Sequence, residues 1–340
     1  MKIPEPKKLP SGNYLIQVQV DGKRVSKTFE TAEDAILWAS SVKVKKVQVK
    51  KEKGSQTLSE AIDAYIEKRE GVLSKLTIRG YRIIQENRFK SVMDKKLNTI
   101  DPSEWQSVIN KESKLCAAKT LKNAYGFLRS VVKESTGEEM PDCKLPQIVK
   151  ADRAFLKPEQ IKPFIEAVAP TRYAIPLLLA LSSLRISEIS ALRWEDIDKD
   201  PEFIKVRGAM VLTEDNTWVR QKTNKNQASN RNVPIMIPQL KEAIERDRKD
   251  SGFVMDITQN SLRSALKDIC EENNLPPLTV HGLRHSFASL AYHLQVPEQI
   301  TMEIGGWSDQ NTMHKIYTHI AQSDITHYST AMADFFAQEK

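Results

Sequence analysis

A proline-containing segment divides this chain into stretches whose hydrophobic patterns differ. The segment, MPDCKLPQIVKADR at residues 140–153, carries two prolines and follows Gly137, a residue type that often ends a helix. Before it, residues 55–140 show only the spacing of amphipathic helices, whereas residues 154–340 mix helical and strand patterns. We therefore expect separately packed domains joined by a linker over 141–153.

A smaller module precedes them, at residues 1–54. NYLIQVQV alternates apolar and polar residues, Asp21-Gly22 favours a two-residue hairpin turn, and KRVSKTF supplies a partner strand. Thr31 with Asp34 is typical of a helix start. The pattern predicts a short antiparallel sheet backed by one helix.

Most of the net charge lies in this module. It holds 12 Lys/Arg against 6 Asp/Glu, which accounts for +6 of the chain's +7. Its last part, residues 43–54, is strongly basic, shows no apolar face and predicts a linker. Such charge is typical of modules that neutralise nucleic-acid phosphates, although a solvated basic tail would carry it equally well.

The middle stretch predicts an all-helical domain. TLSEAIDAYIEKR begins with a capping box formed by Thr57 and Glu60. Further helical patterns follow at about 75–89, 103–111 and 115–135. The last of these carries an apolar stripe from Ala118 to Val132, which would face the domain core.

The third stretch predicts helices packed with a small antiparallel sheet. Its strand candidates are EFIKVRG, NTWVRQK and RNVPIMI, and we expect the last two to pair as a hairpin across TNKNQASN. The expected fold class is multidomain α+β: a small N-terminal three-stranded sheet plus helix, an all-helical middle domain, and a mixed, mainly helical last domain with a small antiparallel sheet.

Composition favours a soluble protein in a reducing, cytoplasmic compartment. Apolar residues make up 40% and charged residues 28%, as in ordinary folded proteins. The longest apolar run, residues 173–184, is too short to span a bilayer, and the N-terminus has no apolar core typical of a signal peptide. The three widely spaced cysteines predict neither a disulfide framework nor a cysteine zinc site.

The stretch TVHGLRHSFASL (279–290) poses the main functional question. His281 and His285, four apart on a predicted helix, could share a metal ion, whereas His281 and Arg284 could share a phosphate. A zincin helix would need a glutamate directly after the first histidine, where Gly282 stands, and no Cys-x-x-Cys or carboxylate cluster supplies further ligands. We therefore favour the phosphate.

Three other stretches carry reactive side chains. In LSSLRISEISALRWEDID, Arg185 starts a predicted helix and Glu188 lies where it could pair bidentately with that guanidinium, although an exposed ion pair would look the same. In RQKTNKNQASNRNVPI, Lys222 lies at the tip of the expected hairpin. IGGWSDQNTMHKIYTHI ends with Tyr317 beside His319.

Together these stretches resemble the tyrosine recombinases, and within them the integrases of bacteriophages and integrative elements. Arg185–Trp194 matches the family's R-x-x-E-[LIV]-x-x-L-x-W, and Lys222-Thr223 matches its hairpin K-T. Residues 281–285 match H-x-L-R-H. Trp307 and Tyr317 match a G-[HW] that precedes a Y-x-H. The resemblance covers about 150–335 well. It extends to the middle domain through LTIRGYRIIQENRF, and by pattern alone to the family's three-stranded N-terminal sheet that binds arm-type DNA sites.

The chain departs from the family pattern at two places. Trp307 stands where histidine is commoner, although phage-type integrases resemble this chain in using tryptophan there. An indole can donate one hydrogen bond or pack in the core, but it cannot transfer a proton. Ser182-Ser183-Leu184 replaces the family's frequent Thr-Gly before the arginine.

The resemblance implies DNA strand transfer without metal, ATP or any other cofactor. Arg185 and Arg284, which we call the phosphate clamp, would hold the scissile phosphate with planar guanidinium groups. Tyr317 would attack the phosphorus and form a 3′-phosphotyrosyl bond. His281 would serve as general base, and Lys222 would protonate the leaving 5′-oxygen.

The remaining site residues have supporting roles or rivals. Glu188 would support Arg185, and His285 would be structural. Lys225 is the rival of Lys222 in the same turn, and Tyr292 and Tyr328 are weaker alternatives to Tyr317. The C-terminal tail predicts a short helix with Met332, Phe335 and Phe336, which would pack on its own domain or on a neighbouring protomer.

The implied partners are double-stranded DNA at core-type and arm-type attachment sites, and three further copies of the chain in a tetramer on DNA. An excisionase and a host DNA-bending protein are candidate accessory partners, and no membrane is involved. The implied location is the cytoplasm of a bacterial host. Rival functions are a type IB topoisomerase, a catalytically silent DNA-binding protein of the same fold, and, more remotely, a metal-dependent nuclease.

Overall fold

The computed structural model describes residues 4–20, 23–52, 54–149, 154–198, 200–221, 230–311, 313–314 and 325–337. The chain packs as two compact units, Met1–Val149 and Lys150–Lys340. The boundary between them falls inside the segment 141–153.

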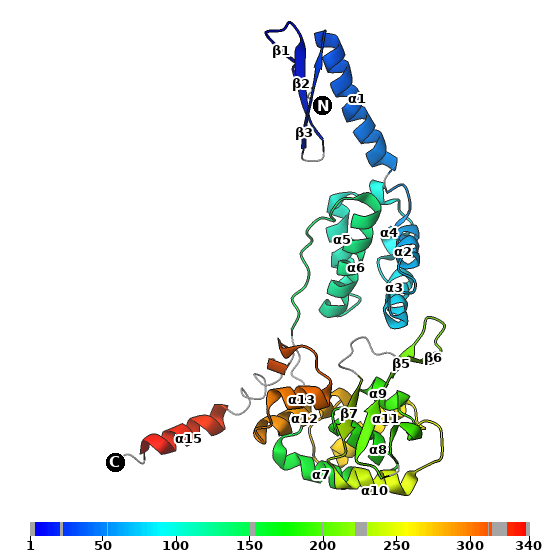
Figure 1. The fold of residues 1–340 in the computed structure, drawn as a ribbon, viewed down its shortest axis with the longest axis vertical. Coiled ribbons are helices and arrows are strands. Elements are labelled where there is room, and N and C mark those ends of the chain that lie inside the picture. The colour runs from blue at the N-terminus through cyan, green and yellow to red at the C-terminus, as the bar shows by residue number, and fades with distance from the viewer. Residues whose placement is uncertain are drawn as a thin grey trace. The chain divides into compact units, whose positions relative to one another are not determined.

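The first unit begins with a three-stranded antiparallel sheet backed by one helix (Figure 1). These elements are β1 (Lys7–Lys8), β2 (Tyr14–Val20), β3 (Lys23–Phe29) and α1 (Ala32–Glu52). Ile16 and Val18 of β2 are buried with Ala35 and Ala39 of α1, as the alternating pattern predicts. The predicted sheet and helix are confirmed, but the predicted linker at 43–54 is wrong over residues 43–52, because α1 continues through them.

The rest of the first unit is a helical bundle, as predicted. Its helices are α2 (Leu58–Glu67), α3 (Lys75–Asn87), α4 (Lys90–Met93), η1 (Leu97–Thr99), α5 (Pro102–Glu112) and α6 (Ala118–Thr136). The capping box at the start of α2 is present: the N–H of Thr57 donates to the carboxylate of Glu60 (2.7 Å), whose own N–H donates back to the Thr57 hydroxyl (3.2 Å). Gly137 ends α6.

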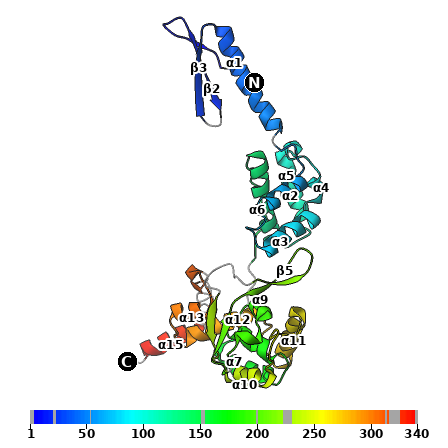
Figure 2. The ribbon, with the colours of Figure 1, turned by 45° about the vertical axis from the view of Figure 1, so that its right-hand side comes forward.

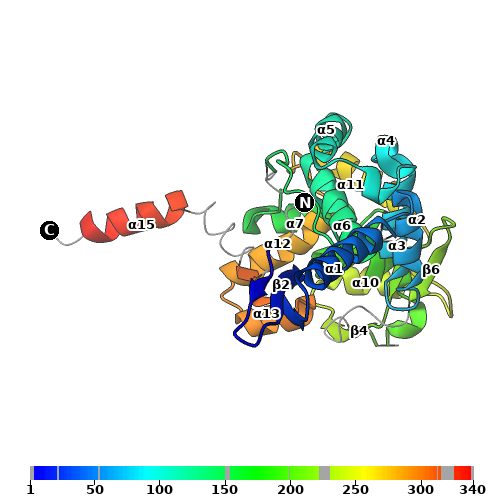
Figure 3. The same ribbon diagram turned by 90° about the horizontal axis from the view of Figure 1, so that it is seen from above.

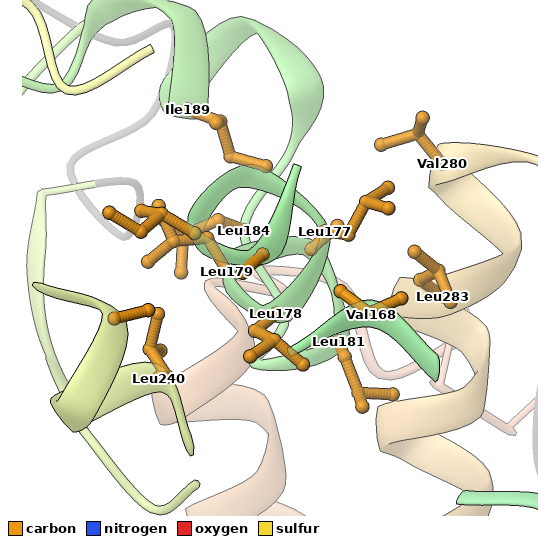
Figure 4. Packing of buried hydrophobic residues seen from close by; sticks show 14 of the residues in the cluster. Val168, Leu177, Leu178, Leu179, Leu181, Leu184, Ile189, Leu240, Val280 and Leu283 are labelled. Atoms are coloured by element: carbon orange, nitrogen blue, oxygen red, sulfur yellow. The ribbon is translucent and has the colours of Figure 1, made fainter. Parts of the chain in front are cut away.

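The second unit is built around α8, whose residues are all buried. Its helices are α7 (Pro158–Val168), α8 (Ala174–Leu181), α9 (Ile186–Ala191), η2 (Trp194–Asp196), α10 (Pro238–Asp247), α11 (Gln259–Glu272), α12 (Val280–His293), α13 (Glu298–Gly305) and α15 (Ile325–Ala337). Leucines point to several sides of α8 and meet Leu240, Val280 and Leu283 of other helices (Figure 4). Helices α7 and α12 lie side by side against this core (Figure 3).

Four short strands form two antiparallel pairs. These strands are β4 (Phe203–Val206), β5 (Ala209–Leu212), β6 (Trp218–Gln221) and β7 (Arg231–Pro234). β4 pairs with β7, and β5 pairs with β6 in a hairpin that projects from the helices of the second unit (Figure 2). The sequence prediction that NTWVRQK and RNVPIMI pair with each other is therefore wrong.

Local turn geometry and burial explain the observed pairing. The β5–β6 turn is short and closed by a hydrogen bond from the N–H of Thr213 to the carbonyl of Thr217 (3.0 Å), with Asn216 at a φ of +59°. Such a turn brings β6 back onto β5 before the chain reaches β7. β7 instead places Val233 opposite Ile204, and both are fully buried.

The predicted C-terminal helix is confirmed as α15. Its apolar side chains Met332, Phe335 and Phe336 are 61–66% exposed. Among the helices that the structure describes, none is long and apolar enough to cross a membrane.

Candidate active site

Arg185 lies at the N-terminal end of α9, as its motif predicts. Its backbone is extended at the N-cap position, and its side chain remains 36% exposed. Nη1 of Arg185 donates to Oε1 of Glu188 (2.7 Å) and Nη2 donates to the carbonyl of Gly306 (2.9 Å). These two contacts fix the guanidinium of a side chain that stays partly exposed.

Glu188 is buried and serves two arginines. Oε2 of Glu188 accepts the backbone N–H of Arg185 (2.9 Å), so the expected bidentate pair with the Arg185 guanidinium is not formed. The N-cap geometry turns one carboxylate oxygen to the backbone instead. The fork comes from Arg231, whose Nη1 and Nη2 reach Oε1 and Oε2 at 3.3 and 3.1 Å. Burial raises the pKa of Glu188, but the charges of Arg231 and Arg185 outweigh it and hold the pKa below its usual value.

Arg284 is the most buried charged side chain of the site, with only 1% exposed. Its Nη1 donates to the carbonyl of Ser183, and its Cζ lies 3.9 Å from the ring centroid of Trp307. Within the residues that the structure describes, Nη2 has no hydrogen-bond partner. Burial, with a further contribution from Arg185, lowers the pKa of the Arg284 guanidinium to about 8.

The HGLRH stretch forms the first turns of α12. Thr279 caps the helix by accepting the N–H of Gly282 (3.0 Å), which places His281 on an exposed part of the first turn. The rings of His281 and His285 meet edge to face at 4.7 Å. Gly282 has a packing reason: a Cβ there would lie 2.8 Å from the carbonyl oxygen of Ala154.

Trp307 is buried and packs in the site. Its ring is stacked at 6.3 Å from that of Phe287 and lies under the guanidinium of Arg284. It follows Gly305 and Gly306, and Gly306 has a φ of +63° that favours glycine. The indole therefore has a packing role in this site, next to the phosphate clamp.

Three sequence candidates cannot be placed. Lys222, its rival Lys225 and Tyr317 lie outside the described residues. Of the rivals of Tyr317, Tyr328 belongs to α15, and Tyr292 is half-buried with its ring 5.6 Å from that of His293.

Two residues of the site are not among the candidates that the sequence motifs predict. Arg231 is nearly buried and contacts Glu188. In the sequence it is simply a charged residue two positions before Val233, on the same side of an expected strand. Ser183 donates its hydroxyl to the carbonyl of Ile304 (3.1 Å) and has a φ of +84°. That left-handed backbone favours glycine, the residue that the family often has there.

The described side chains form a positively charged candidate anion site. The guanidiniums of Arg185 and Arg231 bond the carboxylate of Glu188, and the charge of Arg284 interacts with that of Glu188 without a described hydrogen bond between them. The unbonded Nη2 of Arg284 and the partly exposed Arg185 could both bind a tetrahedral oxyanion. Within the described ranges, no group of three or more His, Cys, Asp or Glu side chains could hold a metal ion.

Comparisons with known proteins match this chain to one family. The model of the "Phage integrase family" matches residues 154–324. The tyrosine recombinase XerC-like protein of Caldanaerobacter subterraneus is 27% identical over 52% of this chain and 53% of its own length. The integrase of Staphylococcus phage L54a is 24% identical over 66% of this chain and 77% of its own.

A solved structure shares the fold. The Tn1549 transposon integrase, in complex with transposon right-end DNA, has a TM-score of 0.61 and 17% identity, and the match covers 81% of this chain and 100% of that one. The chain spans about half the length of the XerC-like relative.

Proposed function

Because this chain belongs to the phage integrase family, we propose that it is a site-specific DNA recombinase that integrates and excises a mobile element. It cuts and rejoins DNA through a 3′-phosphotyrosyl intermediate, with no metal or other cofactor. The observation that carries this proposal is the anion site, in which the buried Arg284 keeps Nη2 without a hydrogen-bond partner among the described residues beside the accessible Arg185.

The phosphate clamp suits a phosphodiester in its transition state. Negative charge builds on the non-bridging oxygens as the nucleophile attacks. Arg284 is held away from water, so an anion relieves its unfavourable burial more than it would for an exposed arginine. Glu188 keeps its charge and fixes Arg185, so the clamp is organised before DNA binds.

The remaining catalytic roles come from the family motif. Tyr317 is the nucleophile and Lys222 the general acid toward the leaving 5′-oxygen. His281, at the exposed start of α12, is the general base. Trp307 packs under Arg284 and transfers no proton.

The domain roles follow the proposed division of the chain. Residues 55–140 bind the core-type site together with 154–340, and 1–54 bind arm-type sites. The sheet face opposite α1 carries Gln17 paired with Ser26 and Gln19 paired with Arg24. Amide and guanidinium groups are the side chains that read adenine and guanine in the major groove.

On DNA we propose a homotetramer in a bacterial cytoplasm, with an excisionase and a host DNA-bending protein as candidate partners. The exposed Met332, Phe335 and Phe336 of α15 fit a tail that packs on a neighbouring protomer.

The test is a nicked suicide substrate that carries the core site, incubated in EDTA with wild type and with Tyr317→Phe. We expect an SDS-resistant protein–DNA adduct with wild type and none with the variant. An adduct that survives the substitution would move the nucleophile elsewhere, with Tyr328 first in line.

The same assay, repeated with Mg²⁺ in place of EDTA, separates two of the rival functions, and the joining of two different duplexes separates the third. Wild type that binds the DNA without cleaving it, with EDTA or with Mg²⁺, would favour a silent DNA-binding protein, whereas cleavage that occurs with Mg²⁺ and is lost in EDTA would favour a metal-dependent nuclease. A type IB topoisomerase would relax one duplex but would not join two different duplexes.

A further inference from the structure

Arg231 occupies a core position at the start of β7. It lies opposite Val206 and two residues before Val233, both buried, and only 5% of its own side chain is exposed. A guanidinium at such a position is costly unless its donors are bonded. The contacts of its guanidinium therefore indicate why an arginine occupies this position.

The described hydrogen bonds of Arg231 lead to the phosphate clamp. Its two Nη atoms hold the carboxylate of Glu188, which in turn holds both the side chain and the backbone N–H of Arg185. Its Nε donates to the carbonyl of Ile304 (2.8 Å), which also accepts the hydroxyl of Ser183. The carbonyl of Ser183 is in turn the acceptor for Arg284.

Gly306 also links Arg231 to Arg185, independently of Glu188. A Cβ on Gly306 would lie 2.8 Å from Nη1 of Arg231, so the backbone of Gly306 rests against that guanidinium. The carbonyl of Gly306 accepts Nη2 of Arg185 (2.9 Å). A shift of Arg231 would therefore displace both acceptors of the Arg185 side chain.

We propose that Arg231 is a positioning residue for the phosphate clamp, which sets the pose of Arg185 through Glu188 and Gly306. This inference rests on the proposed function. Arg248 provides a contrast: it donates to the carbonyls of Ile197 (2.7 Å) and Asp198 (2.6 Å), and none of its described hydrogen bonds reaches the clamp.

The test compares Arg231→Lys with Arg248→Lys in the full chain. A lysine keeps the charge but cannot bond Glu188 through a fork. We expect Arg231→Lys to remain folded at the assay temperature and to bind core-site DNA within about threefold of wild type, while its single-turnover adduct rate falls at least tenfold. Arg248→Lys should match wild type in DNA binding and rate.

A double-mutant comparison separates positioning from packing. In a Glu188→Gln background, Arg231→Lys should slow cleavage by less than about threefold, because its main link to Arg185 is already weakened. Wild-type cleavage by Arg231→Lys, or a loss no larger than its loss of folded protein or DNA binding, would overturn the proposal. Should Arg231→Lys fail to fold, Gly306→Ala disturbs the same contact and should show the same selective loss of rate.

A second measurement does not depend on the reaction. If wild type forms no adduct, the proposed function fails, and stabilisation by inorganic sulfate then tests Arg231 directly. Sulfate should raise the melting temperature of wild type and of Arg248→Lys, with an apparent affinity at least fivefold weaker in Arg231→Lys. Equal sulfate affinity in wild type and Arg231→Lys would overturn the proposal, and so would the absence of any sulfate effect on wild type.

Discussion

Ser183 combines backbone strain with a hydrogen bond in one residue. Its φ of +84° costs a non-glycine residue about 1–2 kcal/mol, whereas its hydroxyl contributes about 1 kcal/mol through the carbonyl of Ile304. Ser183→Ala should therefore destabilise the fold by about 1 kcal/mol, because it keeps the strain and loses the bond. Ser183→Gly should lie within about 1 kcal/mol of wild type, because relief of strain offsets the loss.

Urea unfolding measures the order of the two variants. Ser289→Ala is the matched control, since Ser289 is fully buried in helical α12 and its hydroxyl has no hydrogen-bond partner among the described residues. Because no hydrogen bond is lost, its removal should leave the free energy of unfolding unchanged or raise it. A Ser183→Gly variant less stable than Ser183→Ala would contradict the assigned strain.

Glu188 predicts a pH-dependent stability. Its folded pKa lies below the unfolded value, because the charges of Arg231 and Arg185 outweigh burial. The stabilisation is therefore fully present above the unfolded pKa of about 4.3 and is lost as pH falls through the folded pKa. Glu188→Gln should destabilise the protein by about 3 kcal/mol at pH 7, since the buried guanidinium of Arg231 and the partly exposed one of Arg185 lose their counter-charge.

The difference between wild type and Glu188→Gln should shrink below about pH 4, as Glu188 itself becomes neutral. Urea unfolding at a series of pH values measures it. Glu139→Gln is the control, because the pKa of Glu139 is also lowered, by Lys133, but its side chain is exposed and the pair is screened by solvent. If the difference in the free energy of unfolding between wild type and Glu188→Gln did not change with pH, the assigned role of the Glu188 charge would be wrong.

At the scale of elements, no neighbouring side chain requires a glycine at Gly126, in the middle of α6. It is exposed, and an added Cβ would meet nothing within 4 Å. A glycine inside a helix costs about 0.5–1 kcal/mol relative to alanine. Lys122, Asn123 and Ser130, one turn away, are exposed as well, which fits close approach of a DNA backbone.

Gly126→Ala should therefore change stability and DNA binding in opposite directions. We expect the free energy of unfolding to rise by about 0.5–1 kcal/mol and core-site binding to weaken about fivefold or more. Ser107→Ala, at an exposed position of α5, should favour its helix without weakening binding. Unchanged DNA affinity of Gly126→Ala would remove α6 from the interface.

The same scale shows what sequence patterns can and cannot predict. The elements α1, α9, α12 and the β2–β3 pair follow from local periodicity and caps, so their existence was predictable. The pairing of β6 was mispredicted because β7 finds a buried partner in β4, which is a nonlocal choice. Arg231 was missed for the same reason: its partners Glu188 and Ile304 lie 43 and 73 residues away in the sequence.

At the scale of the whole molecule, the residues that carry most of the net charge precede those that form the helical bundle. Residues 1–53 carry nearly all of the net charge, while the backbone contacts of the helical bundle begin at Gly54, whose carbonyl accepts the N–H of Asn98 (3.0 Å). Removing residues 1–53 should therefore leave the bundle and the phosphate clamp folded.

The truncated chain should separate arm binding from cleavage. We expect it to form the core-site adduct within about threefold of the wild-type rate, because every described residue of the candidate site lies beyond residue 180. Arm-site binding should be lost, and the slope of log affinity against log salt should fall by about 0.9 for each phosphate contact removed. Full-length and truncated proteins are compared by adduct formation and by binding at several salt concentrations. Arm-site binding that persists with an unchanged salt slope would place the arm-binding surface outside the N-terminal module.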